Sequence, residues 1–182
     1  MRQPVVERYQ VAQPVHRFEL VVPQEFVGDG NAFERVSIRH AGFTPDEVIE
    51  ASFRILDQVP AITAGVEVFR ARQLTGPESR AFATAALRLR YDDAQKAPVG
   101  PEKLLEARRY EDAGDDLWHV FNRLSENLLR GGLKDETRCR ADGKRFARTR
   151  AIKGLDRNVR LNKELWNLAQ RLANGEALSF AE

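Results

Sequence analysis

DAGDDLWHVFNRLSENLLRGG, residues 112–132, is the stretch of sequence that decides the fold. Its acidic start, residues 112–115, offers an N-terminal cap and a negatively charged first turn, and Gly131-Gly132 offers a stop. Between them, apolar residues recur at three- and four-residue steps, which places them on one helical face. That face consists of Leu117, Val120, Phe121, Leu124 and Leu128. The stretch therefore predicts an amphipathic helix that packs one side against a core.

Two further helices are predicted before this one. Residues 44–47, Thr-Pro-Asp-Glu, form a capping box with proline at the first helical position. The apolar periodicity that follows extends to about Gln73, and Pro60 should kink or split the helix. Residues 75–78 repeat the capping box and begin a second helix, which we expect to end near Tyr91.

The remaining segments predict one more helix, two short strands and a loop. The last helix covers about residues 156–173, and Asn174-Gly175 provides its stop. Near the N-terminus, the apolar-rich runs 16–22 and 33–40 are typical of strands. Residues 92–101 have loop composition and are the one plausible linker, although we expect no domain boundary there. We therefore expect an α+β fold, mostly α, with about five helices and a short N-terminal β element.

Length and composition favour one globular domain over residues 1–182. The chain has 182 residues, 42% of them apolar and 31% charged, which is enough to bury a sizeable core. The single cysteine, Cys139, excludes an intramolecular disulfide and favours a reducing compartment. Neither a signal-peptide pattern nor a run of about 18 apolar residues occurs. We therefore expect a cytoplasmic protein without membrane contact.

Motifs for catalysis or metal binding are weak. The three histidines lack the spacing of a metal-binding motif, and no glycine-rich turn fits a phosphate-binding loop. The pairs Asp92-Asp93 and Asp115-Asp116 are more simply explained by helix capping than by paired catalytic acids. We therefore predict a non-enzymatic protein with no metal and no cofactor. A small enzyme that uses Asp115 or Cys139 is a minor alternative.

Charge is distributed unevenly along the chain. Residues 130–160 contain eleven Lys and Arg against four Asp and Glu, a net charge of +7, whereas the whole chain carries +2. A basic segment on a mildly acidic body indicates a polyanionic partner. The densest part predicts a loop or hairpin arm between the last two helices, with Gly143 at its turn. Its candidate nucleic-acid-binding residues are Arg138, Arg140, Lys144, Arg145, Arg148, Arg150 and Lys153.

Two interpretations of these cations are open. They could contact the phosphates of DNA or RNA, with Phe146 stacking on a base. The less favoured interpretation is that they pair with acidic helices of this chain or of a second copy, because charge alone guarantees no more than non-specific attraction.

Several segments resemble one known family. They are residues 112–118 and 121–132, the run RTRAIKGLDRNVRLNKELW at 148–166, and the shorter pieces 37–40 and 56–58. Together they resemble the phage/plasmid-like family built on domain of unknown function 932, over about residues 36–173. The resemblance is to the C-terminal portion of longer members, so residues 1–35 stand as a divergent, shortened N-terminal segment. It implies an accessory protein of a mobile genetic element, and it implies no catalytic residues.

The matching helices also carry polar residues at helical spacing. Asn158 and Asn162 are four residues apart, so they share one helical face. If such faces meet, they could form a buried polar network that holds the arm. The candidate residues for this structural network are Asn122, Asn127, Asp156, Asn158 and Asn162.

The function expected from the sequence is that of a non-enzymatic phage or plasmid accessory protein whose basic arm contacts nucleic acid, either DNA or RNA. The alternative is a counter-defence inhibitor, of the anti-CRISPR or anti-restriction type, that binds a host protein or ribonucleoprotein. In that case acidic residues would imitate phosphate, namely Asp92, Asp93, Glu111, Asp112, Asp115 and Asp116. The sequence leaves open whether the chain forms a homo-oligomer.

Overall fold

The computed structural model of the chain describes residues 17–22, 34–39, 44–57 and 59–178. Its helices are α1 (Pro45–Leu56), α2 (Val59–Ala71), α3 (Gly76–Arg88), α4 (Pro101–Leu104), α5 (Leu117–Arg130) and α6 (Leu155–Ala173). Two short 3-10 helices, η1 (Ala94–Lys96) and η2 (Tyr110–Asp112), flank α4. The described chain is therefore mostly helical with little strand, as the sequence predicts.

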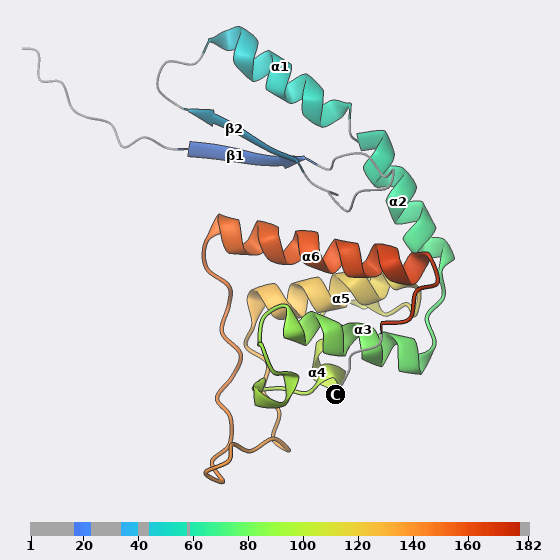
Figure 1. The fold of residues 1–182 in the computed structure, drawn as a ribbon, viewed down its shortest axis with the longest axis vertical. Coiled ribbons are helices and arrows are strands. Elements are labelled where there is room, and N and C mark those ends of the chain that lie inside the picture. Colours follow the sequence, from blue (N-terminus) through green and yellow to red (C-terminus); the bar gives the residue numbers. More distant parts are fainter. Residues whose placement is uncertain (1–16, 23–33, 40–43, 58, 179–182) are drawn as a thin grey trace, which may run out of the picture.

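The strands form a two-stranded antiparallel sheet. β1 (Arg17–Val22) pairs with β2 (Glu34–Arg39), and Arg17 lies opposite Arg39 in the register. Figure 1 shows this hairpin beside α1, with α2 leading from α1 to the helices below. Both strands fall where short apolar-rich runs predict them.

The core lies among α2, α3, α5 and α6. Figure 1 shows α3, α5 and α6 stacked side by side, with α2 crossing at one end. Phe82, Leu124 and Leu165 are fully buried between these helices, and each such side chain stabilises the fold by about 1.5–3 kcal/mol. An aromatic cluster joins α2 to α6, where the ring centroids of Phe69 and Trp166 lie 4.6 Å apart.

The capping boxes begin their helices as predicted. In α3, the hydroxyl of Thr75 accepts from the backbone N–H of Glu78 at 3.3 Å, and the Glu78 carboxylate accepts from the Thr75 N–H at 2.8 Å. The predicted break at Pro60 is a full split, because α1 ends at Leu56 and α2 begins at Val59.

The cap of α5 differs from the prediction. Asp116, not residues 112–115, caps the helix, because its Oδ1 accepts from the backbone N–H groups of Trp118 and His119, both at 3.1 Å. The reason lies outside the helix. The N–H of Leu117 donates to the carbonyl of Arg72 at 2.8 Å, and the backbone bridge that forms there keeps the preceding residues extended.

The interpretation of residues 92–101 as a linker is also corrected. It contains η1 and the start of α4, and Ala97 and Val99 within it are fully buried. A segment whose side chains fill the core is part of the domain and not a linker. The sequence does not reveal this role, because only two residues of the segment, Ala97 and Val99, are buried apolar residues and the rest have loop composition.

α6 ends at Ala173, and Asn174 caps it before Gly175 with φ +80°, as the sequence predicts. None of the helices in the described part of the chain is both long and apolar enough to cross a lipid bilayer.

Candidate nucleic-acid interface

The basic arm, which we define as residues 131–154 between α5 and α6, is anchored on the core at its base. The N–H of Gly132 donates to the carbonyl of Thr149 at 2.7 Å, and the N–H of Thr149 donates to the carbonyl of Leu133 at 2.9 Å. Further along, the N–H of Ile152 donates to the carbonyl of Leu129 at 2.9 Å. The returning leg of the arm, residues 148–153, is therefore held against the C-terminal end of α5.

The returning leg alternates between buried and exposed side chains. Thr149 is buried, and its hydroxyl accepts from the N–H of Leu133 at 3.0 Å. Arg148 and Arg150, on either side, are exposed. This inward and outward alternation is that of an extended strand, and it presents two guanidinium groups from a backbone that is fixed in place.

The tip of the arm is a small hairpin, and Gly143 lies at its turn as predicted. Cys139 and Arg145 form an antiparallel bridge, and the N–H of Arg140 donates to the carbonyl of Lys144 at 2.7 Å. Gly143 has φ +75°, a conformation that glycine adopts without strain. Cys139 is exposed at this tip.

Two of the seven candidate cations are engaged within the protein. The guanidinium of Arg138 donates to the carbonyls of Val99 and Gln95, both at 2.7 Å, so Arg138 attaches the arm to the segment before α4. Arg145 forms an ion pair with Glu136 at 2.6 Å, and Lys134 contacts the same carboxylate at 2.5 Å. Internal pairing therefore accounts for part of the basic block.

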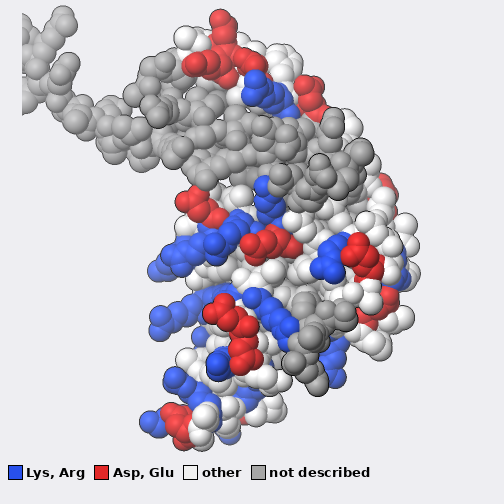
Figure 2. Space-filling view, viewed as in Figure 1, with Lys and Arg blue, Asp and Glu red and all other residues white. Residues whose placement is uncertain are grey.

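The other five candidates are exposed and form no ion pair with another residue in the described part of the chain. Figure 2 shows basic side chains projecting along one edge of the molecule, from the first turns of α6 to the tip of the arm. The five are Arg140, Lys144, Arg148, Arg150 and Lys153.

Asp135 secures the part of the arm that leaves α5, before the hairpin at the tip. The residue is 9% exposed, and its carboxylate accepts from the N–H of Gly100 at 3.0 Å and from the hydroxyl of Thr137 at 2.6 Å. The hydrogen bond from the Thr137 hydroxyl lowers the pKa of Asp135, with further lowering by the Gly100 N–H and the charge of Arg138. The ionised carboxylate therefore stabilises the folded state.

This arrangement predicts a pH-dependent effect of Asp135→Asn. At pH 7 we expect the substitution to lower the free energy of unfolding by about 1–3 kcal/mol, because the amide has one accepting oxygen and an NH2 group where the carboxylate has two accepting oxygens. A carboxyl with a lowered folded-state pKa contributes stability above its ordinary pKa of about 3.9 and loses it as the pH falls further. Urea denaturation should therefore show a smaller difference in the free energy of unfolding between wild type and variant at pH 3 than at pH 7. A difference of equal size at both pH values would contradict this role.

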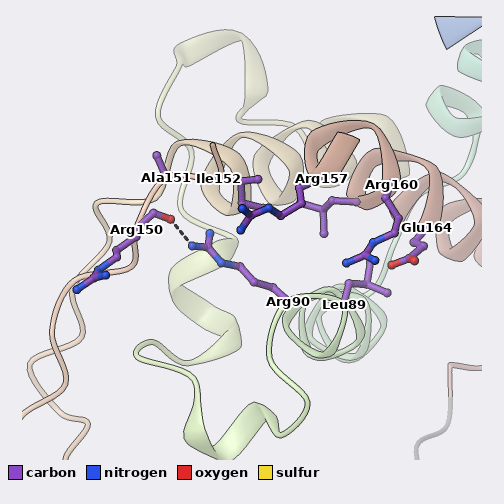
Figure 3. Close-up of a pocket in the computed structure, with 9 residues that line it drawn as sticks. Leu89, Arg90, Arg150, Ala151, Ile152, Arg157, Arg160 and Glu164 are labelled. Atoms are coloured by element: carbon purple, nitrogen blue, oxygen red, sulfur yellow. Dashed lines mark hydrogen bonds between the residues drawn. The ribbon is translucent and has the colours of Figure 1, made fainter. Parts of the chain in front are cut away.

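Three arginines beyond the predicted set share the same edge. Arg90, just after α3, and Arg157 and Arg160, in the first turns of α6, line a cavity with Arg150. Figure 3 shows the carbonyl of Arg150 accepting a hydrogen bond from Arg90. Arg157 and Arg160 could have been found from the sequence, because they lie within the basic segment 130–160. Nothing in the sequence indicates Arg90, whose place depends on how α3 packs.

The predicted polar network is divided in the structure. Asn158 and Asn162 share one face of α6, where Ser125 of α5 donates to the Oδ1 of Asn162 at 2.8 Å. Asn127 lies elsewhere, fully buried against the chain between α4 and η2. Asn122 is half-buried on α5 without a side-chain hydrogen bond to the described residues, and Asp156 is exposed near the start of α6.

The acidic candidates serve different roles. Asp112 is buried beside Arg109 at 2.7 Å, and Asp116 is the cap of α5, so two of the six possible phosphate mimics face inward. Asp93 caps η1 by accepting from the N–H of Gln95 at 2.8 Å. In the described part of the chain, no group of three or more His, Cys, Asp or Glu is placed to hold a metal ion.

Comparisons with known proteins agree on one family. The family model described as domain of unknown function (DUF932) matches residues 24–166. Two proteins of Escherichia coli strain K12, UPF0380 protein YafZ and UPF0380 protein YfjQ, are each 34% identical over 143 residues, which is 79% of this chain. The matched region covers 50% of each of these proteins, so the chain spans about half the length of its relatives. No solved structure matches the chain. With the family model matching most of its residues, the chain belongs to the DUF932 family.

Proposed function

We propose that this chain is a non-enzymatic nucleic-acid-binding protein that contacts phosphates through its basic arm. The observation that carries the proposal is the anchored returning leg, in which buried Thr149 holds Arg148 and Arg150 outward. Cations on a fixed backbone lose less conformational freedom on binding than cations on a free loop. Together with Arg140, Lys144 and Lys153, they offer five exposed charges to a polyanion.

The five exposed cations suit the chemistry of a nucleic-acid backbone. Phosphates recur along a strand, and guanidinium groups can donate two parallel hydrogen bonds to each of them. Such contacts position the nucleic acid without reading its bases, so the proposed binding is largely independent of sequence. A role in phages or plasmids is part of the proposal and is supported by the family resemblance.

The salt dependence of binding tests this proposal. If all five cations contact phosphates of duplex DNA, the logarithm of affinity should fall against the logarithm of salt concentration with a slope of about −4.5, at about 0.9 per contact. We expect the triple substitution of Arg148, Arg150 and Lys153 with Gln to reduce the slope to about −1.8, since two contacts remain. Fluorescence anisotropy with labelled duplex DNA, single-stranded DNA and RNA measures both values.

A matched control removes three cations outside the arm. Arg54 on α1, Arg70 on α2 and Lys96 in η1 have exposed side chains. Their replacement with Gln changes the net charge by the same amount, so a slope near the wild-type value is expected. A slope near zero in the wild type, or an equal decrease in both triple variants, would overturn the proposal.

A further inference from the structure

A cavity of about 360 Å³ lies behind the returning leg of the arm. Its walls come from three segments that are distant in sequence: the end of α3, residues 150–152 of the arm, and α6 between Arg157 and Glu164. The guanidinium of Arg90 joins the α3 wall to the arm, because it donates to the carbonyl of Arg150, and it also donates to the carbonyl of Leu128 in α5. The volume is within the range of small-molecule sites, about 300–1,000 Å³.

The cavity is positively charged. Figure 3 shows the guanidinium groups of Arg90, Arg157 and Arg160 around its interior, whereas the guanidinium of Arg150 points away. Glu164 also lines the cavity and is its one carboxylate among the described lining residues. Arg90 is half-buried and uses two of its five N–H donors on carbonyls. The cavity is therefore lined by more arginines than carboxylates, and Arg90 has N–H donors beyond the two that bind carbonyls.

The rest of the lining is apolar. Leu89, Ile152 and Leu161 lie between the arginines. Apolar side chains of this kind suit the flat face of a base or the carbon atoms of a sugar, whereas inorganic phosphate would leave them unused. The lining is therefore matched to a ligand that combines an anionic group with an apolar part.

We infer that this cavity binds the phosphomonoester of a nucleotide, with Arg157 and Arg160 as its main phosphate contacts and Leu89, Ile152 and Leu161 against the nucleoside. A phosphomonoester carries a charge close to −2 at pH 7, which several arginines lining one cavity can match better than a single arginine can. The nucleotide could be free or at the end of a strand, and the two sources share this chemistry. The strand-end form rests on the proposed function and extends it.

An end group fits the cavity better than an internal phosphate does. An internal phosphodiester has only one negative charge, and its strand must continue in two directions. Here the arm backbone bounds one side, and the contact between Arg90 and the Arg150 carbonyl keeps it against α3. A terminal nucleotide needs one opening, through which the rest of its strand can run along the exposed cations of the arm.

Binding of end-labelled 12-nucleotide DNA strands tests the inference. Three strands of the same sequence are compared, with a 5′-phosphate, with a 3′-phosphate and with hydroxyl groups at both ends. We expect one phosphorylated strand to bind about tenfold more tightly than the hydroxyl strand, the difference of one charge-assisted contact. The variant Arg157→Gln/Arg160→Gln should lose this preference. The variant Arg171→Gln/Arg80→Gln, which removes two exposed arginines outside the cavity, should keep it.

Competition by adenosine 5′-monophosphate separates the two sources. Displacement of the phosphorylated strand, without displacement of the hydroxyl strand, would support the strand-end source. Binding of the free nucleotide that depends on Arg157 and Arg160, with no preference among strands, would support the free-nucleotide source. Absence of both effects in folded protein would overturn the inference. The proposed function would then stand or fall separately on the salt dependence of the hydroxyl strand.

Discussion

Replacing Gly131 with alanine is expected to lower the free energy of unfolding by about 2–5 kcal/mol, combining backbone strain with overpacking. Gly131 ends α5 with φ +62°, where a side chain is unfavourable. An added Cβ would also lie 2.5 Å from the carbonyl oxygen of Arg150 and 2.7 Å from the nitrogen of Ala151, and it would collide with the carbonyl carbon of Arg150. Because these atoms are backbone, the returning leg itself would have to move.

Gly132 provides the matched control for this substitution. Its φ is +78°, but an added Cβ would meet no atom within 4 Å. We therefore expect Gly132→Ala to cost about 1–2 kcal/mol, from backbone strain alone. Urea denaturation measures both losses, and anisotropy measures DNA affinity in the folded variants. Equal losses for the two glycines would show that the arm does not pack on Gly131 as described.

Replacing Asn127 with alanine is expected to lower the free energy of unfolding by about 3 kcal/mol or more, because several buried polar groups lose their partner together. Asn127 is 1% exposed, and its Nδ2 donates to the carbonyls of Leu104 and Glu106 at 2.8 and 2.9 Å. Its Oδ1 accepts from the Nε of Arg108 at 2.5 Å. Without the amide, two carbonyls and one guanidinium lack these hydrogen bonds.

Asn122, on the same helix, serves as the control for Asn127. It is half-buried and forms no side-chain hydrogen bond with the described residues. Asn122→Ala should change stability by no more than about 0.5 kcal/mol. Thermal denaturation compares the variants, and hydrogen exchange should show faster opening of residues 104–108 in Asn127→Ala alone. A small loss for Asn127→Ala would contradict its structural role.

The candidate site was partly predictable from the sequence. The density of cations after Gly131-Gly132 marks the arm, and Gly143 marks its turn. Sequence reasoning could not separate Arg138 from Arg148, although one donates to the carbonyls of Val99 and Gln95 and the other is exposed. The difference depends on the segment before α4, which lies about forty residues earlier in the chain and is adjacent only after folding.

The sequence indicates only part of the cavity lining. Arg157 and Arg160 are three residues apart, so their common helical face can be read from the sequence. Arg90 reaches the same cavity because α3 packs against α5 and places it near the carbonyls of Leu128 and Arg150. No local pattern encodes a contact across sixty residues.

By itself, the sequence determined the five longer helices, the capping boxes, the glycine stops and the position of the basic arm, because caps, turns and periodicity depend on residues within a few positions of one another. Only the tertiary structure decided that Asp116 caps α5, that residues 92–101 belong to the core, and which cations of the arm are exposed. These features depend on hydrogen bonds and burial between distant segments. Their energies exist only once the helices have packed together.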